Sequence, residues 1–195
     1  MKNKALFIDR DGVINNMVLQ KNGNFDSPQT EEQVALVDGV AKLILYCNQN
    51  KIPVIEVSNQ PGVAKGKMSI ETLEAIENKV HSLLKNEGAV INKVYRCLHH
   101  PNAVNEEYKI DCNCRKPKPE LLLKAAYDFG IEINKCVFLG DNTTDIQAGI
   151  NAGCTPILFL HENDEENKVE ANKKCETKYC VKSHEESLNL LKELL

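Results

Sequence analysis

Short apolar runs alternate with longer amphipathic stretches along this chain. The runs rich in β-forming residues predict six strands: Leu6 to Ile8, Ile52 to Val57, Val90 to Cys97, Cys136 to Leu139, Thr155 to Phe159 and Tyr179 to Val181. Apolar residues at helical spacing predict five helices: Val40 to Asn48, Ile70 to Lys85, Leu121 to Phe129, Asp145 to Ala152 and Glu185 to Leu194. Strands that alternate with helices are typical of βαβ units. We therefore expect an α/β fold, a Rossmann-like three-layer sandwich around a mainly parallel sheet.

Three polar segments do not fit this alternation. Residues 15–38 contain turn-forming residues and predict a loop or short hairpin over the carboxyl edge of the sheet. Residues 99–119 are dense in Cys, His, Pro and charge, and residues 162–174 are charged and predict a solvated loop. No repeat, linker or domain boundary is evident in the sequence. We expect one domain, residues 1–195, without a large cap domain.

Composition narrows the class of protein. The chain has 195 residues, of which 42% are hydrophobic, so it can bury a core. Its net charge of −4 argues against a nucleic-acid partner. The first apolar run stops at Asp9, which is too short for a signal peptide, and no stretch is long enough to span a membrane. We expect a cytoplasmic monomer, where disulfides are rare, so metal binding or burial are the favoured fates of its eight cysteines.

Two acidic residues directly follow the first predicted strand, in Asp9-Arg10-Asp11-Gly12. Open α/β sheets bind ligands at the carboxyl ends of their strands. Residues i and i+2 of an extended segment point the same way, so Asp9 and Asp11 could converge on one substrate, one as nucleophile and the other as general acid/base. The alternative is that Asp and Gly simply form a turn after the strand.

Other strand ends offer matching chemistry. Asp141 follows the fourth strand, with Asp145 four residues later, and carboxylate oxygens are ligands that Mg²⁺ prefers. The second strand ends in Ser58-Asn59-Gln60, whose polar groups can donate hydrogen bonds to a phosphate. Residues 115–119, Arg-Lys-Pro-Lys-Pro, add cations on a segment that its prolines predict to be extended. Taken alone, such a basic run is more typical of a solvated surface.

In this order, the motifs resemble those of the haloacid dehalogenase superfamily. The segments that carry the resemblance are Phe7 to Asn15, Ser58 to Gly66, Cys112 to Pro117 and Gly140 to Asp145. The sequences of these segments are similar to those of the branch that contains heptose-bisphosphate phosphatases and the histidinol-phosphatase domain. The resemblance spans about residues 6–153.

The resemblance implies a role for each matching residue. Asp9 would form an aspartyl-phosphate, and Asp11 would protonate the leaving alcohol and then activate water. Ser58 and Lys116 would hold the transferring phosphoryl group. Mg²⁺ would bind Asp9, the Asp11 backbone carbonyl and Asp141. The expected substrate contacts are Asp9, Arg10, Asp11, Ser58, Asn59, Gln60, Arg115, Lys116 and Asn142.

The resemblance also implies a substrate class, a small phosphorylated sugar or polyol. The first expectation is removal of the 7-phosphate of D-glycero-D-manno-heptose 1,7-bisphosphate, and histidinol phosphate is the alternative. Asn142 stands where relatives often have Lys, so we expect a weaker grip on one phosphate or a less charged substrate. A catalytically inactive zinc-loop module that binds nucleic acid or protein is the competing class.

Four soft or borderline ligands lie in two tight pairs, Cys97-x-His99 and Cys112-x-Cys114. They could close a tetrahedron around Zn²⁺, which would be structural because no position stays open. On spacing alone, buried thiols or a redox pair remain alternatives. The resembling phosphatases carry a structural zinc in this loop, about residues 97–114, which favours zinc. Cys47, Cys136 and Cys154 are predicted to be core residues, and Cys175 and Cys180 have no predicted role.

Overall fold

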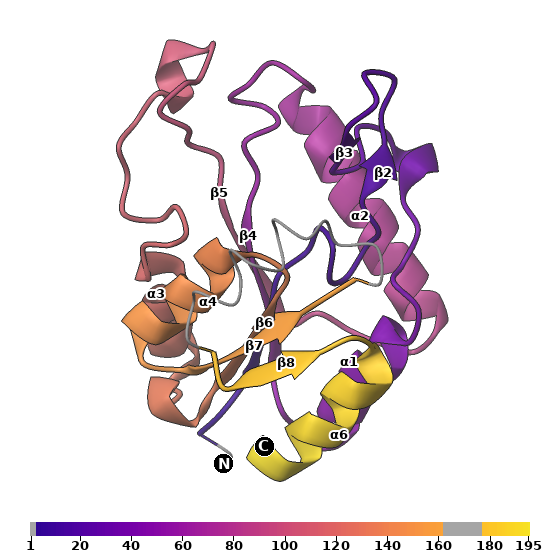
Figure 1. Ribbon diagram of the computed structural model, residues 1–195, viewed down its shortest axis with the longest axis vertical. Helices are drawn as coiled ribbons and strands as arrows, with labels where there is room; N and C mark the ends of the chain where they lie inside the picture. The colour runs from indigo at the N-terminus through magenta and orange to yellow at the C-terminus, as the bar shows by residue number, and fades with distance from the viewer. Residues whose placement is uncertain (1–2, 162–176) are drawn as a thin grey trace.

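The computed structural model describes residues 3–161 and 177–195, and its main feature is a six-stranded sheet (Figure 1). The strands are β1 (Leu6–Ile8), β4 (Val54–Asn59), β5 (Lys93–Cys97), β6 (Val137–Gly140), β7 (Thr155–Phe159) and β8 (Tyr179–Val181). Their order is β5-β4-β1-β6-β7-β8, and every neighbouring pair is parallel. The parallel sheet expected from the sequence is confirmed.

The helices cover the sheet on both faces. They are α1 (Val40–Gln49), α2 (Ile70–Asn86), α3 (Glu120–Phe129), α4 (Thr143–Ala152) and α6 (His184–Leu194), with short 3-10 helices at Glu31–Gln33, Glu106–Tyr108 and Ile133–Lys135. Figure 1 shows α3 and α4 on one side of the sheet and α1, α2 and α6 on the other. This is the expected three-layer sandwich. Within the described residues, no helix has the length and apolar character needed to cross a membrane.

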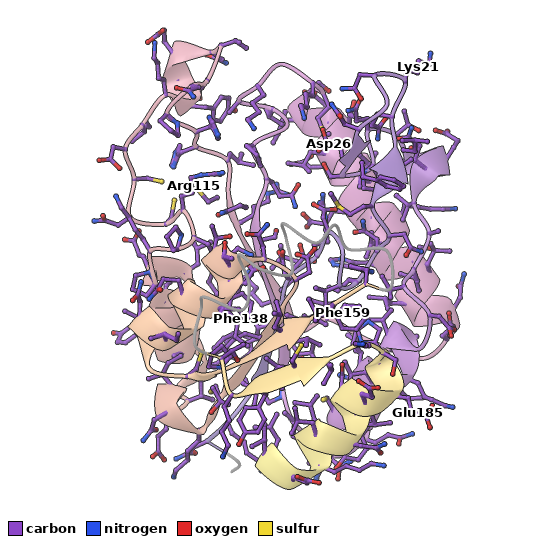
Figure 2. All side chains as sticks on the ribbon, in the orientation of Figure 1. Lys21, Asp26, Arg115, Phe138, Phe159 and Glu185 are labelled. Atoms are coloured by element: carbon purple, nitrogen blue, oxygen red, sulfur yellow. The ribbon has the colours of Figure 1, made fainter. Side chains whose placement is uncertain are left out.

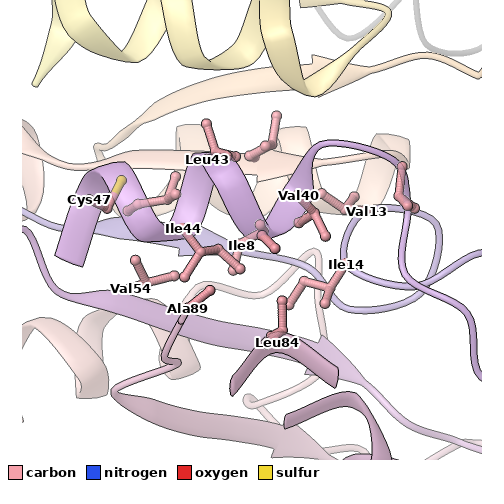
Figure 3. Close-up of a cluster of buried hydrophobic side chains, with 14 of the residues drawn as sticks. Ile8, Val13, Ile14, Val40, Leu43, Ile44, Cys47, Val54, Leu84 and Ala89 are labelled. Atoms are coloured by element: carbon pink, nitrogen blue, oxygen red, sulfur yellow. The ribbon is translucent and has the colours of Figure 1, made fainter. Parts of the chain in front are cut away.

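Alternate residues of β1 pack into two separate hydrophobic cores, one on each face of the sheet. Leu6 and Ile8 of β1 pack with α1, α2 and α6, whereas Phe7 points to the opposite core, under α3 and α4. Figure 3 shows the first core, in which Ile8, Ile44 and other apolar side chains meet between α1 and the sheet. Because β1 is central and buried on both faces, the residues that follow it are held on a rigid support.

Helix ends match their sequence signals. Ser69 caps α2 by accepting a hydrogen bond from the Thr72 amide, and Gly130 and Gly153 end α3 and α4 in the left-handed conformation. Cys47, Cys136 and Cys154 are buried, as expected. The predicted solvated loop at residues 162–174 and Cys175 lie outside the described residues.

The segment after β1 forms the predicted hairpin. Strands β2 (Val18–Leu19) and β3 (Phe25–Asp26) pair antiparallel in a small separate sheet. At the other end of the chain, His184 of α6 lies 2.8 Å from the Val13 carbonyl through Nε2, which ties the last helix to the loop that follows β1. Both contacts support the segment that follows Asp11.

One local prediction is wrong. Residues 115–119 are not extended, because Lys118 donates its amide to the Arg115 carbonyl at 2.9 Å and closes a turn, and the Lys116–Pro117 bond is cis. The prolines restrict the backbone, but its conformation here is set by the Lys118–Arg115 hydrogen bond and by the ion pairs of the Lys116 side chain. The turn brings Lys116 to the carboxyl edge of the sheet.

Candidate active site

Three carboxylates converge at the carboxyl edge of the sheet. Asp9 follows β1, Asp141 follows the neighbouring β6, and Asp145 lies in the first turn of α4. Their nearest carboxylate oxygens all lie within 4.8 Å of one another. The sequence predicted that Asp9 and Asp141 would meet. Asp145 was seen only as part of a motif, and the structure adds it to the cluster.

Two glycines permit this close approach. Gly12 has a φ of 85°, and a Cβ on it would collide with the Asp141 carboxylate. A Cβ on Gly140 would collide with the Asp145 side chain. Asp145 also accepts from the Asn142 amide at 3.0 Å, which completes a capping box at the start of α4. Backbone geometry therefore fixes two of the three carboxylates.

Lys116 is the cation of this cluster. Its Nζ lies 2.9 Å from Asp9 Oδ1, 2.6 Å from Asp145 Oδ1 and 2.9 Å from the Val57 carbonyl. Burial would lower its pKa, but the charges of Asp145 and Asp9 outweigh burial and raise it. The Lys116 backbone is held by Asn59, whose side-chain amide exchanges two hydrogen bonds with it at 3.0 and 3.1 Å. Lys116 is therefore charged and fixed beside Asp9.

Asp9 and Asp11 have opposite protonation tendencies. Burial, with the nearby Asp145 charge, raises the pKa of Asp9 to about 7, although Lys116 opposes the rise. Burial acts on Asp11 too, but there the charge of Arg10 and hydrogen bonds from Gln60, Arg10 and Asn15 hold its pKa below the usual value. Two carboxylates whose environments separate their pKa values suit different roles in one reaction.

A cleft of about 780 Å³ opens over these residues. Of the expected substrate contacts, Asp9, Asp11, Asn59, Arg115, Lys116 and Asn142 line it. Arg10, Ser58 and Gln60 are not among its lining residues and are buried. Arg10 instead donates to both Asp11 oxygens at 3.2 and 3.1 Å and to Gln60 at 2.6 Å. Asn142 caps α4, since its side chain accepts from the Thr144 amide.

Opposite walls of the cleft come from distant segments. The hairpin contributes Met17, Phe25 and Asp26, which the sequence did not identify as site residues, and the segment before α2 contributes Lys65 and Lys67. Lys67 forms an ion pair with Asp26 that joins the two segments. Figure 2 shows Asp26 and Arg115 on the two sides of the region above the strand ends. The cleft therefore has cations on two walls, of which Lys67 and Lys116 are paired with carboxylates, and it is partly apolar on the hairpin.

The second cluster consists of Cys97, His99, Cys112 and Cys114. Cys97 Sγ lies 3.5 Å from Cys112 Sγ and 3.2 Å from Cys114 Sγ, and His99 Nδ1 lies 3.4 Å from Cys114 Sγ and 3.9 Å from Cys97 Sγ. A tetrahedral zinc with Zn–S bonds of about 2.3 Å needs ligand separations of roughly 3.5–3.8 Å. Burial would raise the pKa of Cys112, but hydrogen bonding with Cys114 and His99 lowers it to about 7. This donor set fits zinc.

The oxygen cluster also fits its expected ion. Asp9, Asp141 and Asp145 supply hard carboxylate oxygens, and the raised pKa of Asp9 shows that the local positive charge does not fully offset its burial. The geometry differs from the expected set in one respect, because Asp145 joins Asp9 and Asp141. Asp145 is also the closer ion-pair partner of Lys116, at 2.6 Å against 2.9 Å for Asp9.

We expect Lys116→Met to destabilise the fold. The substitution leaves Asp9 and Asp145 buried without their shared cation, and removal of one partner of a buried ion pair typically costs about 3–5 kcal/mol. Urea unfolding at neutral pH measures the loss. Lys124→Met, which removes an exposed i,i+4 pair with Asp128, is the matched control and is expected to change stability by less than about 0.5 kcal/mol. Equal losses in the two variants would contradict the prediction.

The family model for HAD-hydrolase-like proteins matches residues 113–187. The fold and the strand-end carboxylates define the same class, a HAD-like hydrolase. Two curated relatives, the D-glycero-alpha-D-manno-heptose-1,7-bisphosphate 7-phosphatase of Burkholderia mallei and the corresponding beta-anomer enzyme of Helicobacter pylori, are each 34% identical over 165 residues. These alignments cover 84% and 83% of this chain and 83% and 85% of the relatives.

A solved structure agrees with these relatives. The D,D-heptose 1,7-bisphosphate phosphatase of B. bronchiseptica, complexed with magnesium and phosphate, is 25% identical and superposes with a TM-score of 0.80 over 100% of both chains. The chain belongs to the family of HAD phosphatases that contains these heptose-bisphosphate phosphatases. The resemblance expected from the motifs is confirmed, and with it the class of enzyme, a phosphatase.

Proposed function

We propose that this phosphatase removes the 7-phosphate of D-glycero-D-manno-heptose 1,7-bisphosphate in a Mg²⁺-dependent reaction. The observation that carries the proposal is the pairing of Asp9 with Lys116 beside Asp141, at the base of a cleft that Arg115 and Lys65 also line. The relatives named for this reaction support the substrate. They include both anomers at equal identity, so the proposal leaves the anomer open.

In the proposed reaction, an oxygen of Asp9 attacks the 7-phosphorus as the bond to the sugar oxygen breaks. Asp11 gives a proton to that oxygen, and the sugar alcohol leaves. Water then attacks the aspartyl-phosphate, Asp11 takes its proton, and inorganic phosphate departs with Asp9 restored. In the structure Asp11 is held as the carboxylate by Arg10 and Gln60, which is the form that the second step needs. The first step uses the protonated form, so Asp11, which lines the cleft, takes up a proton from solvent before it protonates the leaving oxygen.

Local cations would offset the repulsion between Asp9 and an anionic ester. Lys116 lies beside Asp9, and Arg115 lines the cleft next to it. Mg²⁺ would be held by Asp9, Asp141 and the Asp11 carbonyl, and when bound it supplies positive charge at the phosphoryl oxygens. Asp145 would anchor Lys116. The cluster of Cys97, His99, Cys112 and Cys114 would hold a structural zinc that supports the Arg115 segment.

The proposal includes a single-domain cytoplasmic monomer whose partner is a small phosphorylated sugar. A net charge of −4 supports a small anionic substrate bound by local cations over a long polyanion. Histidinol phosphate, the alternative substrate, carries a single phosphate, whereas Arg115 and Lys65 add cations to the cleft besides Lys116, which supports a substrate with two.

Phosphate release from a panel of esters tests the substrate. We expect heptose 1,7-bisphosphate, offered as separate anomers with Mg²⁺, to have a kcat/KM at least about tenfold above histidinol phosphate, a difference of about 1.4 kcal/mol in transition-state binding. Product analysis should show the 1-phosphate retained. A preference for histidinol phosphate would overturn the substrate assignment, and absence of turnover on every ester would favour the binding-module alternative.

A further inference from the structure

A glutamate is buried in the middle of the sheet, two positions before Ser58. Glu56 lies on β4 and is 1% exposed. Strand alternation places it on the same face as Val54, which belongs to the core under α1 and α2, and on the same face as Ser58. An apolar residue would pack at this position without any desolvation cost. A carboxyl group here therefore needs an explanation other than packing.

Glu56 contacts Ser58, one of the residues proposed to hold the phosphoryl group. The Ser58 hydroxyl donates to Glu56 Oε1 at 3.3 Å, and Ser58 is fully buried. Burial raises the pKa of Glu56 to about 8, and the Glu77 charge adds to this while Arg10 opposes it. A protonated Glu56 can donate to the Ser58 oxygen, which would free the Ser58 proton for a phosphoryl oxygen.

A second buried residue, Arg10, holds Asp11. The Arg10 guanidinium is 0% exposed and uses Nε and Nη2 to bind Asp11 and Gln60. Its Nη1 has no hydrogen-bond partner among the described residues, and neither does Glu56 Oε2. These bonds hold Arg10 against Asp11, and within the described part of the chain no hydrogen bond joins Arg10 to Glu56.

The remaining polar neighbour of Glu56 lies on α2. His81 Nε2 is 4.0 Å from Glu56 Oε2, too far for a direct hydrogen bond, and is likewise without a partner in the described part of the chain. No strong contact pulls the Glu56 carboxyl toward α2. Its shortest described contact is the one with Ser58, on the same strand.

We propose that Glu56 is a positioning residue for phosphoryl transfer, which orients the Ser58 hydroxyl. This inference rests on the proposed function for the role of Ser58. It assigns Glu56 a role in turnover and no contact with the substrate.

Two substitutions at one position test the proposal. Glu56→Gln keeps the shape and a hydrogen bond to Ser58, and Glu56→Met keeps the length without polar atoms. We expect Glu56→Met to lower kcat between about 10- and 100-fold, the scale of a small misplacement of catalytic groups, with KM changed by less than about threefold. Glu56→Gln should restore kcat to within about threefold of the wild type. The melting temperature of Glu56→Met should not fall, because an apolar side chain replaces a buried polar one.

A double-mutant cycle shows whether Glu56 acts through Ser58. If it does, Glu56→Met should lower the kcat of Ser58→Ala by a smaller factor than it lowers that of the wild type. Glu74→Met is the control, because Glu74 lies exposed on α2, pairs with Arg96 at 3.5 Å and has no described hydrogen bond to Ser58 or Glu56. It should leave kcat unchanged.

The inference is overturned by an unchanged kcat in Glu56→Met, by an equal loss in Glu56→Gln, or by factors that multiply fully in the cycle. All ratios are also measured with an aryl phosphate. A failure of heptose 1,7-bisphosphate as substrate therefore overturns the proposed function while the ratios on the aryl ester still decide the role of Glu56.

Discussion

Asp9→Asn should abolish most phosphate release while the fold is kept. The amide has the shape of the carboxyl group but cannot form an aspartyl-phosphate, so kcat should fall by roughly 10³-fold or more, as for other removed nucleophiles. The fold should persist because Lys116 retains its ion pair with Asp145 at 2.6 Å and its bond to the Val57 carbonyl. Steady-state phosphate release and thermal unfolding measure the two effects.

The same substitution at a distant site gives the control. Asp38→Asn changes an exposed carboxylate that does not line the cleft, and it should leave kcat within about twofold. Denaturing electrophoresis of acid-quenched wild-type protein with ³²P-labelled substrate should also trap label on the chain, and Asp9→Asn should trap none. Turnover by Asp9→Asn at the wild-type rate would remove Asp9 from the mechanism.

Local sequence patterns were sufficient to predict the strands of the main sheet, but they predicted the ends of only some of them. The first and the last two strands match their predicted bounds, because each is a short run of β-forming residues with a polar residue or glycine within two positions of each end. The second strand begins at Val54 and runs on through Asn59. Ser58 and Asn59 are ladder residues paired to β5, which is why Ser58 is buried instead of lying free at the strand end. Pairing with a distant strand decides this, and no local pattern reports it.

The direction of side chains explains the differences at the site. Spacing of i and i+2 correctly placed Asp9 and Asp11 on the cleft. The same alternation turns Arg10 into the interior, where it binds Asp11. Its charge alone did not indicate this position. Asp145 joins the cluster because Gly140 leaves room for it. Asp26 and Lys67 meet across 41 positions of sequence, which only the fold can bring about.

Loss of the four-ligand cluster should have the second largest effect. Residues 98–114 contain one turn of 3-10 helix, at Glu106–Tyr108, and few buried apolar side chains. Zinc bound by Cys97, His99, Cys112 and Cys114 would therefore provide most of the order of this loop. Arg115 follows the last ligand directly and donates to the His99 carbonyl at 3.3 Å, so its position on the cleft depends on the loop.

We expect purified protein to contain one zinc per chain, and Cys112→Ser or a strong chelator to remove it. Amide hydrogen exchange over residues 98–114 should lose its protection, and KM should rise about tenfold or more as Arg115 is released. The effect on kcat should be smaller, because Lys116 keeps its reciprocal bonds with Asn59 and its ion pairs with Asp9 and Asp145. Cys180→Ser, at an exposed thiol outside the cluster, is the control. Zinc-free protein with unchanged KM and loop protection would contradict a structural role for the metal, and a fall in kcat alone would place its influence on Lys116 instead of Arg115.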